Sequence, residues 1–86
     1  MNALFQECLL NVSPETKRQF ELSDFIAERL DSYLKENQMS QSDLAKMVGK
    51  SKSEISRWMT GRHNFTFETV ARIETAIGRR LLDIAH

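Results

Sequence analysis

The side chains with the clearest chemical potential are basic and hydroxyl groups gathered between residues 40 and 64. This stretch carries five basic residues (Lys46, Lys50, Lys52, Arg57 and Arg62) and two acidic ones (Asp43 and Glu54). Residues 1–39 carry four basic and seven acidic residues, and residues 65–86 carry three of each, so the zero net charge hides an uneven distribution. A cationic region backed by an acidic N-terminal third favours a domain that docks on phosphate groups in one orientation.

The sequence shows no set of residues in a pattern that would support catalysis. An enzyme needs a nucleophile with a base, a coupled carboxylate pair or a metal cluster, and none is visible. His63 and His86 are too few and too far apart for a metal site, and no Cys or His spacing matches zinc. Cys8, the single cysteine, excludes an internal disulfide and is interpreted as a small buried hydrophobe. We therefore expect no enzymatic activity, no metal and no cofactor.

The length of the chain predicts one small domain. With 86 residues, it lies near the size at which a single core just stabilises itself, so a second protomer would help. No apolar run reaches the length of a membrane span or of a signal-peptide core. We expect a cytoplasmic protein with no membrane partner and no small-molecule substrate.

Two helix-start signals organise the cationic region. Ser40 is followed three residues later by Asp43, and Ser51 is followed by Glu54 at the same spacing. Each pair predicts a capping box, which satisfies free backbone N–H groups at a helix start. Gly49, just before the second signal, suits the left-handed conformation at the end of the first helix. The spacing predicts two short helices joined by a tight turn.

The apolar residues of this stretch fit two helices that pack together. Leu44 and Val48 lie four residues apart, as do Ile55 and Met59, so each pair shares one helical face. Ala45 is small enough to let the two helix axes approach closely. The pattern predicts a helix-turn-helix over residues 41–61.

Six residues of this motif carry a resemblance to a known family: Gln41, Leu44, Ala45, Gly49, Ile55 and Trp58. The sequence resembles the lambda-repressor-like, or XRE, helix-turn-helix regulators of bacteria and phages from about residue 25 to residue 84. The resemblance implies a transcriptional regulator, a repressor, that binds double-stranded DNA. It also implies a homodimer on a palindromic operator, which reads the inverted repeat through a recognition helix at residues 51–60.

The resemblance also assigns roles to individual residues. It implies that Ser51, Lys52, Ser53 and Arg57 reach base edges in the major groove, where Lys and Arg donate to guanine O6 and N7. It places Gln41 at a phosphate, where its amide and the free N–H groups of its helix end both meet the backbone. Lys50, Arg62, His63 and Asn64 flank the recognition helix and are predicted to contact the sugar-phosphate backbone. Trp58 invites a base-stacking hypothesis, but we expect it in the core, where the family has an apolar residue.

The flanking residues complete the predicted fold. Ser13-Pro14 predicts a short helix to about residue 20, and apolar spacing predicts a first core helix over residues 23–37. Thr66 is predicted to cap a helix that ends at Gly78, and residues 79–84 fit either a fifth short helix or an extended tail. The fold class is therefore all-α: a compact bundle of about five helices with a central helix-turn-helix in residues 23–86, preceded by a helical extension in residues 1–22.

Residues 1–12 have a possible helical apolar face made of Leu4, Phe5, Cys8, Leu9 and Val12. Two interpretations remain open: the segment folds onto the core of its own chain, or it offers a surface to a second protomer or another protein. An extra N-terminal segment before this motif resembles the HigA-like antitoxins of type II toxin-antitoxin modules. That resemblance implies repression of the protein's own operon and a ribonuclease toxin as partner. The alternative is a stand-alone or phage-derived regulator with no toxin partner.

Overall fold

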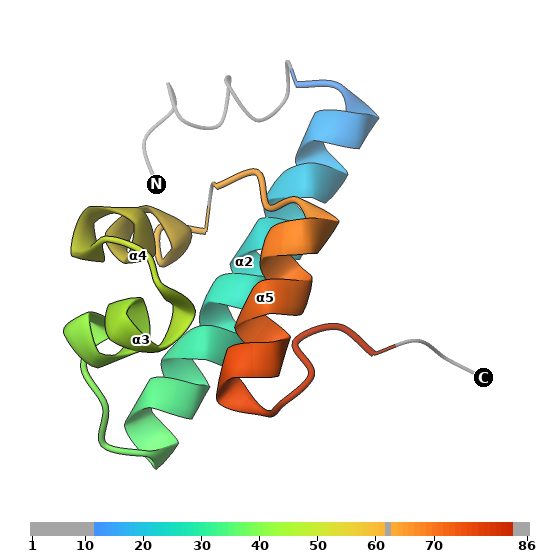
Figure 1. Cartoon of the computed structure of the whole chain (residues 1–86). Coiled ribbons are helices and arrows are strands. Elements are labelled where there is room, and N and C mark those ends of the chain that lie inside the picture. Colours follow the sequence, from blue (N-terminus) through green and yellow to red (C-terminus); the bar gives the residue numbers. More distant parts are fainter. Residues whose placement is uncertain (1–11, 62, 84–86) are drawn as a thin grey trace.

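The computed structural model of the chain describes residues 12–61 and 63–83. Within these ranges it contains four helices and no strand: α2 (Pro14–Glu36), α3 (Gln41–Val48), α4 (Lys52–Trp58) and α5 (Phe67–Ile77). Helices α3 and α4 lie together on one side of the long helix α2, and α5 lies alongside α2 (Figure 1). The all-α class is confirmed, and no described helix is long and apolar enough to cross a membrane.

Helix α2 is a single helix of 23 residues. It begins as predicted, because the Ser13 side chain accepts a hydrogen bond from the Thr16 N–H at 3.2 Å and Pro14 occupies the first turn. The predicted break between residues 20 and 23 is wrong. The hydroxyl of Ser23 does not cap a new helix but donates to the carbonyl oxygen of His63, 40 residues away in sequence.

The buried face of α2 is narrower than the apolar pattern predicts. Ile26, Leu30 and Leu34 are buried, as expected for the core face of an amphipathic helix. Leu22 and Phe25 continue the same apolar spacing toward the N-terminus of α2, but they are 40% and 44% exposed. The first half of α2 therefore projects past the core that the second half helps to form.

Helices α3 and α4 begin directly after the serine residues that were predicted to cap them. Ser40 and Asp43 form a complete capping box, with both hydrogen bonds between 2.9 and 3.1 Å. Gly49 ends α3 with a φ of 71°, in the left-handed region that a residue with a side chain rarely adopts. At α4, the Ser51 side chain accepts from the Glu54 N–H at 3.2 Å, and only this half of the capping box forms among the described hydrogen bonds.

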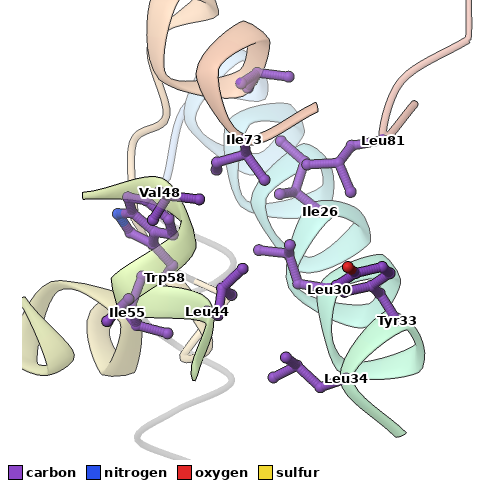
Figure 2. Packing of buried hydrophobic residues seen from close by; sticks show 12 residues of the cluster. Ile26, Leu30, Tyr33, Leu34, Leu44, Val48, Ile55, Trp58, Ile73 and Leu81 are labelled. Atoms are coloured by element: carbon purple, nitrogen blue, oxygen red, sulfur yellow. The ribbon is translucent and has the colours of Figure 1, made fainter. Parts of the chain in front are cut away.

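The core joins all four helices. Leu30 of α2, Leu44 of α3, Ile55 of α4 and Ile73 of α5 are all 0% exposed, and Trp58 is 2% exposed (Figure 2). The prediction that Trp58 belongs to the core is confirmed.

The segment after α5 differs from the five-helix expectation. Gly78 ends α5 with a φ of 68°, and residues 79–83 form no helix. The Glu74 carboxylate accepts the N–H groups of Leu81 and Leu82 at 2.6 and 3.1 Å, so these donors are satisfied without a helical turn. Leu81 is 1% exposed and lies beside Ile26 (Figure 2). The count of about five helices is thus too high by one in the described part of the chain.

Replacing Trp58 by Ala is expected to lower the free energy of unfolding by about 3 to 5 kcal/mol, because it removes a large aromatic side chain from a packed core. A loss of this size is a large share of the stability of a small domain. Thermal melting followed by far-ultraviolet circular dichroism measures it, and Trp58→Phe is the milder control. An unchanged melting temperature together with lost DNA affinity would instead support a base-stacking role.

Candidate nucleic-acid interface

Helix α4 presents one polar face to solvent. Lys52, Ser53 and Arg57 are exposed, while Ile55 and Trp58 on the opposite side are buried against the rest of the domain. Ser53 and Arg57 are four residues apart, as are Lys52 and Ser56, so these polar side chains lie along one edge of the helix. The exposed edge of α4 therefore carries three of the four residues predicted to reach base edges.

The fourth predicted residue, Ser51, lies just outside the helix as its N-cap. Its Oγ accepts the hydrogen bond from Glu54 that starts α4. The hydroxyl hydrogen of Ser51 remains a donor, because a capping serine uses only its oxygen as acceptor. Ser51 can thus serve the helix start and donate outward at the same time.

The two basic residues of α4 have no carboxylate partner. Among the ion pairs of the described residues, none within 4.0 Å involves Lys52 or Arg57. Lys50, in the turn between the helices, is different: its Nζ lies 3.9 Å from the Glu54 carboxylate, and its side chain is 30% exposed. Lys52 and Arg57 on α4 therefore carry uncompensated positive charge, whereas the charge of Lys50 is partly compensated.

Gln41 connects the two helices of the motif. It is the first residue of α3, and its side-chain oxygen accepts a hydrogen bond from the Ser56 hydroxyl of α4 at 3.0 Å. With its oxygen held in this way, the amide NH₂ of Gln41 is the group left to donate. The predicted phosphate donor therefore sits at the start of α3 and beside the exposed edge of α4.

The loop after α4 is held by two neighbouring residues of α2 that the sequence analysis missed. Ser23 is 3% exposed, and its hydroxyl donates to the His63 carbonyl oxygen at 2.5 Å. Gly61 has a φ of 78°, and a Cβ there would overlap the carboxylate of Asp24. No local sequence signal links these positions, because each contact joins residues that lie far apart in the chain. Together they fix the path of the loop from which His63 and Asn64 project.

His63 is partly buried in an aromatic cluster. Its ring centroid lies 4.8 Å from that of Phe65, in an edge-on arrangement, and 6.3 Å from that of Trp58. Burial lowers the pKa of His63, the nearby positive charge of Arg57 lowers it further, and Glu54 opposes the shift. Asn64 is exposed, and Arg62 lies outside the described residues. The structure thus holds the backbone of the loop firmly while leaving Asn64 accessible.

One flank of this surface is acidic. A hollow of about 420 Å³ lies between α2 and the motif and is lined by Asp24, Glu28 and Asp31, together with Gln41 and residues 59–61. Carboxylates at this position repel phosphate groups, so they oppose a phosphate on the hollow side of Gln41 and direct a polyanion toward its α4 side. Among the described residues, no group of three or more His, Cys, Asp or Glu side chains has the arrangement of a metal site.

Comparison with protein families agrees with this arrangement. The family model HTH_3, described as helix-turn-helix, matches residues 30–84. These residues contain α3, α4, α5 and the second part of α2, so the chain belongs to the HTH_3 helix-turn-helix family. The match supports a DNA-binding regulator of transcription. Comparison with curated proteins and with solved structures gives no match.

The lowered pKa of His63 predicts a pH-dependent stability. Because the folded state binds this proton less readily than the unfolded state, stability is fully present above the ordinary histidine pKa of about 6.5 and falls as the pH drops through the folded pKa. The melting temperature should therefore decrease between pH 7.5 and pH 5.5.

His63→Gln should reduce this decrease while it keeps the backbone carbonyl that Ser23 requires. The matched control is His86→Gln, which removes the other histidine of the chain. If both variants keep the parent slope of melting temperature against pH, the neutral ring of His63 contributes nothing to stability.

Proposed function

We propose that the protein is a repressor that binds an inverted repeat in double-stranded DNA as a homodimer, with α4 in the major groove and no catalytic role. The observation that supports this most is the exposed edge of α4, where Lys52 and Arg57 have no carboxylate partner in the described structure. Basic side chains that form no ion pair within the protein can donate hydrogen bonds to acceptors on DNA. The match to the HTH_3 family supports the DNA-binding class of this proposal.

Each side chain has a distinct role in the proposed complex. Lys52 and Arg57 donate to guanine O6 and N7, while Ser51 and Ser53 supply hydroxyl groups to other base edges. Gln41 meets a phosphate through its amide and through the free N–H groups at the start of α3. Lys50, Arg62, His63 and Asn64 are assigned to the sugar-phosphate backbone, where contacts set the register without reading sequence.

The dimer follows from the size of the recognition helix. Helix α4 has seven residues, which corresponds to about 10 Å of helix and covers only a few base pairs. A two-fold symmetric pair doubles the site and maps onto a palindrome, with half-sites about one helical turn apart.

Footprinting on the DNA upstream of the gene tests the proposal. We expect a protected site with dyad symmetry, and an affinity that falls steeply as salt is raised because bound counterions are released from phosphates. A protected site without dyad symmetry, or an affinity that is insensitive to salt, would contradict the proposed mode of binding.

Arg57→Ala should weaken binding to the cognate site by about 1 to 3 kcal/mol and relax the preference at one base position. Lys50→Ala should instead weaken all sequences about equally and reduce the salt dependence, as expected for a phosphate contact. Lys46→Ala, which removes an exposed charge of α3, is the matched control. In a binding-selection assay, an unchanged preferred sequence for the Arg57 variant would exclude its proposed reading role.

A second function is favoured by the acidic flank of α2. Asp24 and Glu28, together with Asp31, whose carboxylate is paired with Lys35 at 2.8 Å, form a negative surface. Such a surface suits a basic protein such as a ribonuclease toxin, which would make this regulator an antitoxin. Copurification with the product of an adjoining gene tests it, with Glu28→Lys as the variant that should reduce capture. A gene without such a neighbour, or capture that is indifferent to Glu28→Lys, would favour the stand-alone regulator.

A further inference from the structure

An apolar surface lies apart from the helix-turn-helix. Leu22, Phe25 and Phe67 are 40%, 44% and 87% exposed, and they are three of the four large hydrophobic side chains exposed in the described residues. Leu22 and Phe67 line a groove of about 420 Å³ together with Leu82, where the first half of α2 lies beside the start of α5 (Figure 1). Phe25 continues the same surface next to Leu22 and Leu82. Apolar surface of this kind on a small domain marks a contact site.

This apolar groove belongs to parts of the fold that the proposed DNA contacts leave almost unused. Its walls come from the first half of α2, from Asn64 and Phe65, from the first residue of α5 and from Leu82. None of its lining residues is in α3 or α4. A partner in the groove would therefore leave the exposed edge of α4 free for DNA.

Phe67 is both a wall of the groove and a projection beside it. It is the first residue of α5, and this helix start is fixed because the Thr66 side chain accepts a hydrogen bond from the Thr69 N–H at 3.1 Å. An exposed aromatic ring on a capped helix loses little freedom when it binds, and such rings are typical anchors of protein interfaces. Phe67 therefore has the properties of an interface anchor.

We propose that the apolar groove is the surface through which two copies of this chain form the homodimer, with Phe67 of each protomer seated in the groove of the other. The proposal rests on the homodimer of the proposed function and adds the contact surface to it. A two-fold symmetric interface uses the same patch on both protomers, so that patch must contain a projection and a hollow that receives it. Phe67 and the groove beside it supply both.

The charges around the groove favour an apolar partner over a charged one. Arg18, the basic residue of the lining, is already paired with Glu21 at 3.0 Å. Glu15 is then the only charged lining residue without an ion pair among the described residues. An apolar centre with a polar rim is the usual composition of an interface between identical subunits. A second copy brings the same apolar side chains and no large excess of charge.

The exposed area suits the centre of a dimer interface. An aromatic side chain contributes about 150 to 250 Å² when it is buried, so the exposed fractions of Phe25 and Phe67 amount to about 250 Å² per protomer. This is about a third of the roughly 800 Å² that each partner buries in a standard interface. Leu22, Leu82 and the polar rim are available for the remainder.

The dimensions of the domain are compatible with a dimer on DNA. The domain measures 38 × 33 × 21 Å, so two copies in contact have their centres between about 21 and 38 Å apart. Half-sites one helical turn apart are separated by about 34 to 36 Å, which lies within this range. Contact through a surface outside α3 and α4 thus allows both recognition helices to reach successive major grooves.

Sedimentation velocity of the full chain without DNA tests the surface. We expect the parent protein to be a dimer at micromolar concentration. Phe67→Asp should raise the Kd of the dimer by about 100-fold or more, because two-fold symmetry removes the aromatic anchor twice. Met47→Asp, which replaces a side chain of α3 that is 42% exposed and lies outside the groove, is the matched control and should leave the dimer unchanged.

The fold of the protomer should survive Phe67→Asp. The ring of Phe67 is 87% exposed, so its removal takes almost nothing from the core. An unchanged far-ultraviolet circular dichroism spectrum checks this point. A monomeric parent protein, or a Phe67→Asp variant that remains as dimeric as the parent, would overturn the proposal.

Cross-linking between two different variants identifies the contact. Cys8→Ser removes the only cysteine, and Leu22→Cys or Phe67→Cys then gives a protein with a single thiol. When these two proteins are mixed, a short bis-maleimide reagent should join one to the other, because each groove receives residue 67 of the second protomer. Met47→Cys mixed with Leu22→Cys is the control and should give no such product. Absence of the product that joins residues 22 and 67 would also overturn the proposal, and it would assign the groove to another occupant.

The contact surface and the proposed function can fail separately. A dimer that cross-links through the groove but protects no inverted repeat would support the surface and contradict the proposed function. A protected inverted repeat, bound by a dimer that survives Phe67→Asp, would support the proposed function and overturn the surface.

Discussion

The helix-turn-helix of this protein depends on burial, because its two helices are too short to be stable alone. Helix α3 has eight residues and α4 has seven, whereas isolated helices shorter than about 12 to 15 residues are marginal in water. They persist because Leu44, Ile55 and Trp58 are almost completely removed from solvent against α2 and α5. The same packing determines which edge of α4 stays exposed, since the residues between the buried positions must point outward. The candidate DNA-reading face is therefore a consequence of core formation.

Helix α2 also positions residues outside the core. Its first half holds the loop after α4 through the hydroxyl of Ser23 and through the close approach of Asp24 to Gly61. Any other residue at position 61 would have to displace the Asp24 side chain and would have a strained backbone conformation. Glycine is therefore required for two separate reasons. Ser23 and Asp24 have no proposed contact with DNA, but they position the loop that carries His63 and Asn64, which are proposed to contact it. Such an arrangement fits the general need for a functional group to rest on a rigid supporting element.

Local signals in the sequence predicted the local features well, and long-range contacts account for the failures. Ser40, Ser51 and Gly49 each form a hydrogen bond with a residue no more than four positions away in the chain. Their spacing was therefore enough to predict α3, α4 and the turn. The predicted break within α2 was wrong, since residues 20–23 contain no Gly or Pro to end a helix and the Ser23 hydroxyl donates to the His63 carbonyl oxygen instead of capping a new one. Residues 79–84 allowed either a fifth short helix or an extended tail, and residues 79–83 form no helix because Glu74 accepts the N–H groups of Leu81 and Leu82. Phe67 is apolar, yet it begins α5 at the rim of a groove that Leu22 and Leu82 also line, and it is 87% exposed.

The loop at residues 63–65 belongs to two surfaces at once. His63 and Asn64 are assigned to the DNA backbone, while Asn64 and Phe65 also line the apolar groove. A molecule bound in the groove would restrict this loop, and a phosphate bound by the loop would restrict it from the other side. Because coupling between two sites is reciprocal, the factor by which filling the groove raises DNA affinity must equal the factor by which bound DNA raises affinity at the groove. The clamp formed by Ser23 limits the size of that coupling, since a loop already fixed by α2 has little conformational freedom left to lose.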